Sequence, residues 1–64
     1  MKFFLPKGQT LRVFLPDTWI DFHADDTPLT AYFEGGGCVL THNQDKTLLG
    51  AWGPRQFLKA EIVK

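Results

Sequence analysis

Apolar and polar residues alternate with a period of two in several short runs of the chain. The residues of these runs that suit a core are Leu11, Val13 and Leu15, then Ile20 and Phe22, then Leu29, Ala31 and Phe33. Because successive side chains of a β-strand point to opposite faces, this period predicts strands that each have one core-facing side. No stretch before residue 54 sustains a helical period. The pattern therefore predicts an all-β fold.

Turn-forming residues separate these runs at six places. They are Pro6 with Gly8, Pro16 with Asp17, Asp25 to Pro28, Gly35 to Gly37, Asn43 to Lys46, and Gly53 with Pro54. Short apolar runs divided by Gly, Pro, Asn and Asp are typical of strands joined by turns. We predict one small β domain, residues 1–64, folded as a five- to six-stranded antiparallel barrel or strongly bent sheet of the SH3-like or OB-like type.

The closing segment, residues 54–64, has two interpretations. Apolar residues alternate with charged ones from Leu58 to Ile62, which favours a strand. Gly53 followed by Pro54 also begins short helices. We favour the strand, and a short C-terminal helix is the alternative.

Composition and length indicate a folded protein that needs additional stabilisation. The chain has 64 residues, of which 44% are hydrophobic and 22% charged, as in ordinary globular proteins. One core of this size contributes about 3–5 kcal/mol, so small domains often oligomerise. A single cysteine excludes an internal disulfide and favours a reducing compartment. The apolar run at the amino terminus is interrupted too early for a signal peptide. We expect a cytoplasmic homo-oligomer with no cofactor and no membrane association.

The charges are segregated along the chain although their formal sum is zero. Residues 1–12 contain three basic residues and no acid, residues 13–45 contain six acids and no Lys or Arg, and residues 46–64 contain four basic residues and one acid. If the chain ends pair with each other, the molecule has one acidic and one basic side, and the acidic side would attract a basic partner. An evenly mixed surface is the alternative.

The segment TWIDFHADD, residues 18–26, has the highest density of chemically versatile side chains. In an extended chain, Asp21, His23 and Asp25 project from one face together with Trp19. Carboxylates and imidazole are ordinary ligands of zinc and manganese, so a metal site at these three residues is a remote alternative. We favour solvent-facing residues that contact a partner.

The glycine run before Cys38 lacks the signals of a phosphate-binding loop, because a strand-like run follows it in place of a helix. It predicts a hairpin turn. Cys38 and His42 lie four residues apart on one predicted strand face, about 13 Å from each other at about 3.3 Å per residue. A nucleophile and its base must lie within about 3.2 Å of each other. We expect no enzymatic activity.

These observations favour a non-enzymatic binding module, a regulator or inhibitor such as phages and mobile elements encode, that engages a basic surface of another protein. The residues expected to contact this partner are Asp17, Trp19, Asp21, His23, Asp25, Asp26, Trp52 and Arg55. The alternative is an oligomeric protein that binds single-stranded nucleic acid with basic termini and aromatic stacking. Its contact residues would be Lys2, Lys7, Arg12, Arg55, Lys59 and Lys64. The zero net charge counts against this alternative, since nucleic-acid-binding domains usually have a basic excess.

Overall fold

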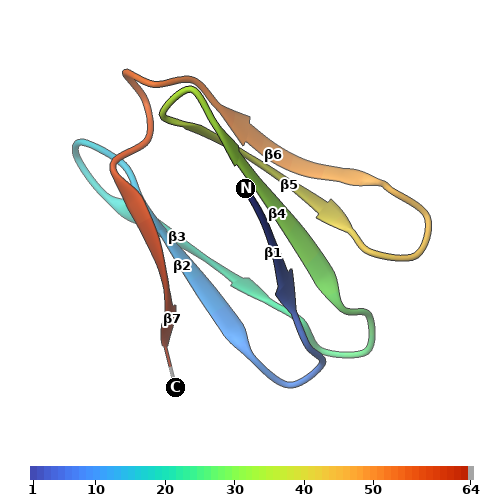
Figure 1. Ribbon diagram of the computed structural model, residues 1–64. Helices are drawn as coiled ribbons and strands as arrows, with labels where there is room; N and C mark the ends of the chain where they lie inside the picture. The colour runs from blue at the N-terminus through green and yellow to red at the C-terminus, as the bar shows by residue number, and fades with distance from the viewer. Residues whose placement is uncertain (64) are drawn as a thin grey trace.

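The computed structural model describes residues 1–63, and these residues form seven β-strands and no helix. The strands are β1 (Lys2–Leu5), β2 (Thr10–Phe14), β3 (Trp19–His23), β4 (Leu29–Glu34), β5 (Gly37–His42), β6 (Leu48–Trp52) and β7 (Lys59–Val63). They pair antiparallel in two sheets with the orders β1-β4-β5-β6 and β3-β2-β7 (Figure 1). No bilayer-spanning helix is present in the described part of the chain. The predicted all-β fold is confirmed, and the strand interpretation of the closing segment is confirmed over Lys59–Val63.

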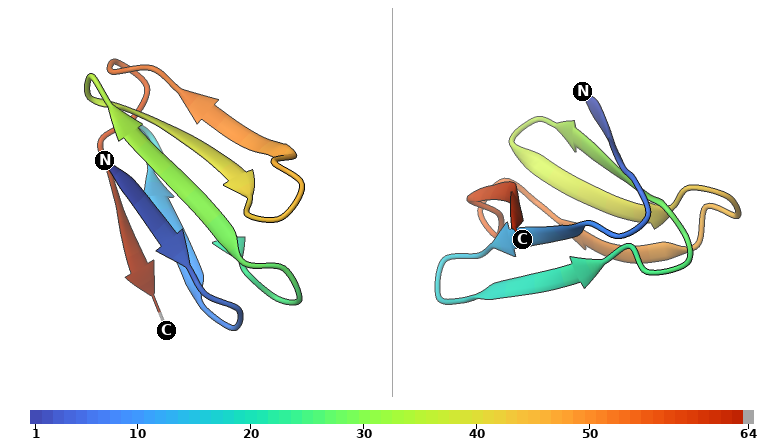
Figure 2. Two further views of the ribbon diagram at one scale, coloured as in Figure 1. Left: turned by 45° about the vertical axis from the view of Figure 1, so that its right-hand side comes forward. Right: turned by 90° about the horizontal axis from the view of Figure 1, so that it is seen from below.

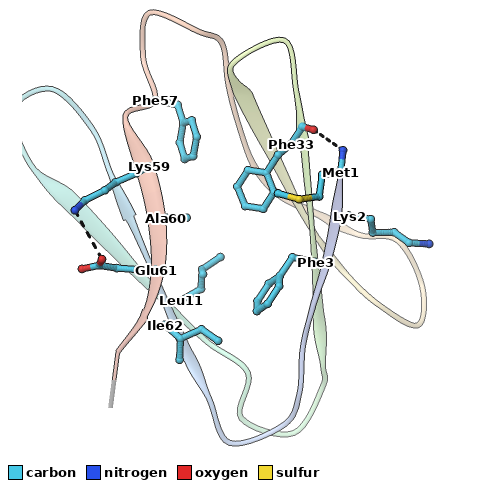
Figure 3. A pocket seen from close by; sticks show the side chains of 10 residues that line it. All are labelled: Met1, Lys2, Phe3, Leu11, Phe33, Phe57, Lys59, Ala60, Glu61 and Ile62. Carbon is cyan, nitrogen blue, oxygen red and sulfur yellow. Dashed lines mark hydrogen bonds and ion pairs between the residues drawn. The ribbon is translucent and has the colours of Figure 1, made fainter.

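The predicted closed barrel is not formed. Within residues 1–63 no strand pairing connects β7 to β1, and none connects β3 to β6. The two sheets face each other, with β1 and β7 on the same open side (Figure 2). A barrel needs a continuous ladder around its circumference, whereas here the side chains of Phe3, Phe33 and Phe57 lie between β1 and β7 (Figure 3). The strand number also exceeds the predicted five or six, because the short segments that form β1 and β6 are both strands.

The core lies between the sheets and contains most of the predicted inward-facing residues. Its fully buried apolar side chains are Leu5, Leu11, Val13, Ala24, Leu29, Ala31 and Leu40. Leu15, Phe22 and Phe33 are partly buried against this cluster, as the alternation predicted. Ile20 is the exception, with 39% of its surface exposed, because β3 is an edge strand.

The predicted glycine turn is confirmed between β4 and β5. Glu34 pairs with Gly37, so Gly35 and Gly36 alone form the loop. Their φ angles are 57° and 81°, the positive values that a two-residue hairpin loop of the primed type requires. Gly37 itself belongs to β5, and a Cβ at this position would lie 2.6 Å from the carbonyl oxygen of Trp52. Glycine here permits the close approach of β5 to the end of β6.

The two ends of the chain lie in different sheets. β1 pairs with β4, and β7 pairs with β2. The prediction of one acidic and one basic side required the two chain ends to pair with each other. Within the described residues they do not. The terminal ammonium of Met1 donates a hydrogen bond to the carbonyl of Phe33 at 2.7 Å. On the opposite side of the molecule, the rings of Phe22 and Trp52 meet edge to face at 5.7 Å and connect β3 to β6.

Candidate partner-binding surface

Trp52 lies between two surface hollows at one end of the molecule. The first hollow, of about 420 Å³, is lined by Tyr32, Val39, Trp52 and Pro54. The second hollow, of about 400 Å³, is lined by Trp52 together with Asp17 and Arg55. We call Tyr32, Val39, Trp52, Pro54 and Arg55 the Trp52 surface.

A tight turn fixes Pro54 and Arg55 beside the Trp52 ring. The backbone N–H of Gln56 donates to the carbonyl of Gly53 at 3.0 Å, and the N–H of Gly53 donates to the Gln56 side-chain oxygen at 3.2 Å. Pro54 restricts φ at the second position of this turn. The guanidinium of Arg55 is therefore attached to a backbone that loses little conformational freedom on binding.

The Trp52 surface continues onto the outer face of the first sheet. Across this face Lys2 lies opposite Tyr32, Tyr32 opposite Val39, and Val39 opposite Ala51. Phe4 and Leu48 are also exposed on this face, and 37% of the surface of Val39 is exposed. The solvent-facing side of an antiparallel sheet is normally polar. This face therefore exposes more apolar side chains than the solvent-facing side of a sheet usually does.

Three of the residues predicted to contact a partner lie together in this region. Asp17, Trp52 and Arg55 line the same hollow, although they come from the β2–β3 turn, the end of β6 and the β6–β7 connection. Tyr32 and Val39 were not among the predicted contact residues. The alternation of hydrophobic residues in β4 and β5 placed them opposite the core, but it did not show that the row would continue across β6 at Ala51, beside Trp52.

The other predicted residues of β3 contact neighbours within their own sheet. Arg12 donates to both carboxylate oxygens of Asp21, at 2.8 and 3.1 Å, and its guanidinium lies 4.8 Å from the centroid of the Trp19 ring. The hydroxyl of Thr10 and Nδ1 of His23 are 2.8 Å apart. The hydrogen bond from Arg12 holds the pKa of Asp21 below its ordinary value. These contacts neutralise the charge of Asp21 within the molecule.

Asp25 and Asp26 lie in the β3–β4 connection, at the opposite end of β3 from Asp17. Both are exposed. The segment predicted as one acidic contact region is therefore divided between one end of the molecule, a paired strand face and the other end.

Most of the other residues considered for metal binding or catalysis already form hydrogen bonds or are buried. Among residues 1–63, no three His, Cys, Asp or Glu side chains are grouped as they would be around a metal ion. The predicted ligand atoms of Asp21 and His23 already take part in hydrogen bonds. Cys38 is 2% exposed, and burial raises the pKa of its thiol, which disfavours the reactive thiolate.

The predicted nucleic-acid contacts are distributed over both faces of the molecule. Lys2 lies on the outer face of the first sheet, whereas Arg12 and Lys59 lie on the outer face of the second. Arg12 is paired with Asp21, and Nζ of Lys59 lies 3.7 Å from Glu61 Oε2. Lys7 and Arg55 lie in separate connections, and Lys64 lies outside the described residues. The described basic residues are not gathered in a single strip.

The largest hollow, of about 590 Å³, is an apolar groove on the open side between β1 and β7. Phe3 and Phe33 line it from the first sheet, and Phe57, Ala60 and Ile62 line it from the region of β7, with Lys59 and Glu61 also at its border (Figure 3). No local sequence pattern predicts this groove, because it arises from the separation of the two sheets.

The chain was compared with protein-family models, curated proteins and solved structures, and none of them matches it.

Proposed function

We propose that the chain is a non-enzymatic binding module, a regulator or inhibitor, that binds another protein through the Trp52 surface. The observation that supports this proposal is the apolar row on the outer face of the first sheet, which leads from Tyr32 and Val39 to Ala51, the residue before Trp52. Trp, Tyr and Arg are the residues most enriched at the energetic centres of protein interfaces. Tyr32 and Arg55 lie on an ordered strand and an ordered turn, and Trp52 lines the hollows beside both of them.

The charges around this surface suggest the chemistry of the partner. Asp17 borders the hollow on one side of Trp52, and Glu34 borders the hollow on the other. Arg55 is the basic residue between them. A complementary partner would present an apolar patch flanked by basic groups, which would pair with the two carboxylates at the edge of the contact.

The acidic residues at the far end of β3 have a different role in this proposal. Asp25 and Asp26 are too remote from Trp52 along the strand to line its hollows, but their exposed charge would increase the rate at which a basic partner approaches. Asp21 stabilises the second sheet through Arg12. Of the predicted acidic segment, only Asp17 is then a direct contact residue.

Matched charge reversals test this assignment. Arg55→Glu and Asp17→Lys change residues at the second hollow, whereas Lys7→Glu and Asp45→Lys make comparable charge reversals in exposed connections elsewhere. Tagged variants would be used to capture partners from lysate of the cells that produce the protein. We expect a partner that the wild type and both controls retain, and that Arg55→Glu or Asp17→Lys loses. Equal retention by all four variants, or equal loss, would show that the Trp52 surface is not the contact.

A further inference from the structure

Strand β7 has one unpaired edge beside the apolar groove. Within residues 1–63 it pairs with β2 alone, so its other edge has backbone N–H and C=O groups available for a further strand. Its apolar side chains are also incompletely covered, with 43% of Ile62 and, just before the strand, 64% of Leu58 exposed. Figure 3 shows Ile62 and Ala60 on the side of β7 that faces the groove. An edge of this kind is a site for the addition of a strand.

The sequence of β7 is complementary to itself in one antiparallel register. When two copies pair about Ala60, Lys59 of each copy lies opposite Glu61 of the other, and Ala60 lies opposite its own counterpart. Leu58 and Ile62 also become opposite neighbours on the groove side. Opposite charges and apolar side chains facing each other across strands both stabilise the pairing.

Other registers are unfavourable. Pairing about Glu61 places two glutamates directly opposite each other, and pairing about Lys59 does the same with two lysines; like charges in such positions destabilise a sheet. A shift by one residue would place an outward-facing residue opposite an inward-facing one, which the pleat does not allow. The charges of β7 therefore select the register about Ala60.

We propose that β7 pairs antiparallel with β7 of a second copy, so that the two three-stranded sheets join in a six-stranded sheet across a twofold axis at Ala60. Arg12 already pairs with Asp21 on one side and lies opposite Glu61 on the other. In the dimer, Lys59 of the second copy extends this row of alternating charges. The same pairing places the apolar side of the second β7 along the groove and covers it. The interface is separate from the Trp52 surface.

Charge exchange tests the register. We would measure the self-association of the full 64-residue chain by sedimentation equilibrium. Lys59→Glu and Glu61→Lys each turn two attractions across the axis into repulsions, so each should weaken the dimer about tenfold or more. The double variant Lys59→Glu/Glu61→Lys restores opposite charges and should restore the dimer. Lys7→Glu, in the exposed connection between β1 and β2, is the control and should leave it unchanged.

A cysteine pair reports the same register independently. In an antiparallel pair, opposite Cα atoms lie about 4.5–5.5 Å apart, within the range of a disulfide. Ala60→Cys should therefore give a disulfide-linked dimer on mild oxidation, whereas Glu61→Cys should not, because its counterpart is not opposite. The wild type, whose Cys38 is buried, is the background control.

A monomer at all accessible concentrations would overturn the proposal. So would a dimer that neither single reversal weakens, or one that the double variant fails to restore. Circular dichroism of each variant distinguishes loss of pairing from loss of folding, since Lys59 and Glu61 are both exposed. Partner capture by a monomeric Lys59→Glu variant would show that the two surfaces act separately.

Discussion

Arg12 of the central strand β2 connects to β3 through its side chain and lies opposite Glu61 of β7. It forms a two-point ion pair with Asp21 on β3, lies over the ring of Trp19, and faces Glu61 on β7. These contacts explain why the chemically dense segment 18–26 does not present its charges freely. The alternation pattern predicted that Trp19 and Asp21 share a strand face. That Arg12 lies beside them depends on the register of β2 and β3, which the pattern does not specify.

The Asp21 ion pair gives a pH-dependent contribution to stability. The pKa of Asp21 is lower in the folded chain than its ordinary value of about 3.9. The contribution is therefore present above that value and is lost as the pH falls through the lowered pKa. We expect Asp21→Asn to melt below the wild type at neutral pH, and the difference to narrow as the pH falls below 4 in thermal melts followed by circular dichroism.

Asp25→Asn, in an exposed connection, is the control and should remain close to the wild type at every pH. A difference between Asp21→Asn and the wild type that stays constant down to strongly acidic pH would contradict the role assigned to the ion pair.

Glycine is needed for different structural reasons at positions 35 and 37. Gly35 has a positive φ but open space around its Cβ position, whereas Gly37 approaches the Trp52 carbonyl. Asparagine tolerates the left-handed conformation, so Gly35→Asn should change the free energy of unfolding by no more than about 0.5 kcal/mol. Gly37→Ala forces β5 and β6 apart and should cost about 1–3 kcal/mol. Urea unfolding measures both, and the reverse order would show that the turn rather than the strand contact needs glycine.

At the scale of strands, the two sheets are connected through aromatic contacts on one side and remain separate on the other. Trp52, at the end of β6, reaches Phe22 of β3. This contact requires glycine at position 50, because a Cβ there would overlap the Trp52 ring. The Trp52 ring thus closes one side of the core and also forms the centre of the proposed contact surface.

Gly50→Ala should displace the Trp52 ring and separate β6 from β3. We expect a red shift of tryptophan emission and a loss of about 1–3 kcal/mol in unfolding free energy, because an added methyl group forces a packed ring to move. The measurement is best made in a Trp19→Phe background, so that Trp52 alone emits. Ala51→Ser, one residue along on the exposed face, is the control. Emission unchanged by Gly50→Ala would contradict the packing described for Trp52.

Local patterns predicted the elements better than their arrangement. The period of two and the positions of Pro, Gly and Asp identified the strand runs, the six turns and most of the core, because each depends on neighbouring residues. The alternation from Leu58 to Ile62 likewise identified β7. Which strands pair depends on contacts distant in sequence. For this reason the prediction of a barrel or strongly bent sheet is only partly confirmed, and the groove was not foreseen.

The same limit applies to the candidate site. Trp52 and Arg55 were predicted from their local combination with Gly53 and Pro54. Asp17 was predicted for its charge, and its position beside Arg55 follows from the packing of the β2–β3 turn against the β6–β7 connection. Tyr32 and Val39 required the register of β4 and β5, which no local pattern supplies.

For the whole molecule, we propose two surfaces for two partners: the β7 edge binds a second copy and the Trp52 surface binds another protein. The two assignments can be separated because the surfaces lie on different sheets. A crosslinking side chain placed on one sheet reports only the molecule that contacts that sheet.

Site-specific photocrosslinking at Tyr32 would show whether another protein contacts the Trp52 surface. A benzophenone analogue of phenylalanine would replace Tyr32 on the first sheet or, as the control, Phe14 on the outer face of the second. After irradiation in the cells that produce the protein, position 32 should give a discrete adduct with another protein, and position 14 should give none with that protein. No adduct from position 32, or the same adduct from both positions, would contradict the assignment of the Trp52 surface as the partner-binding site.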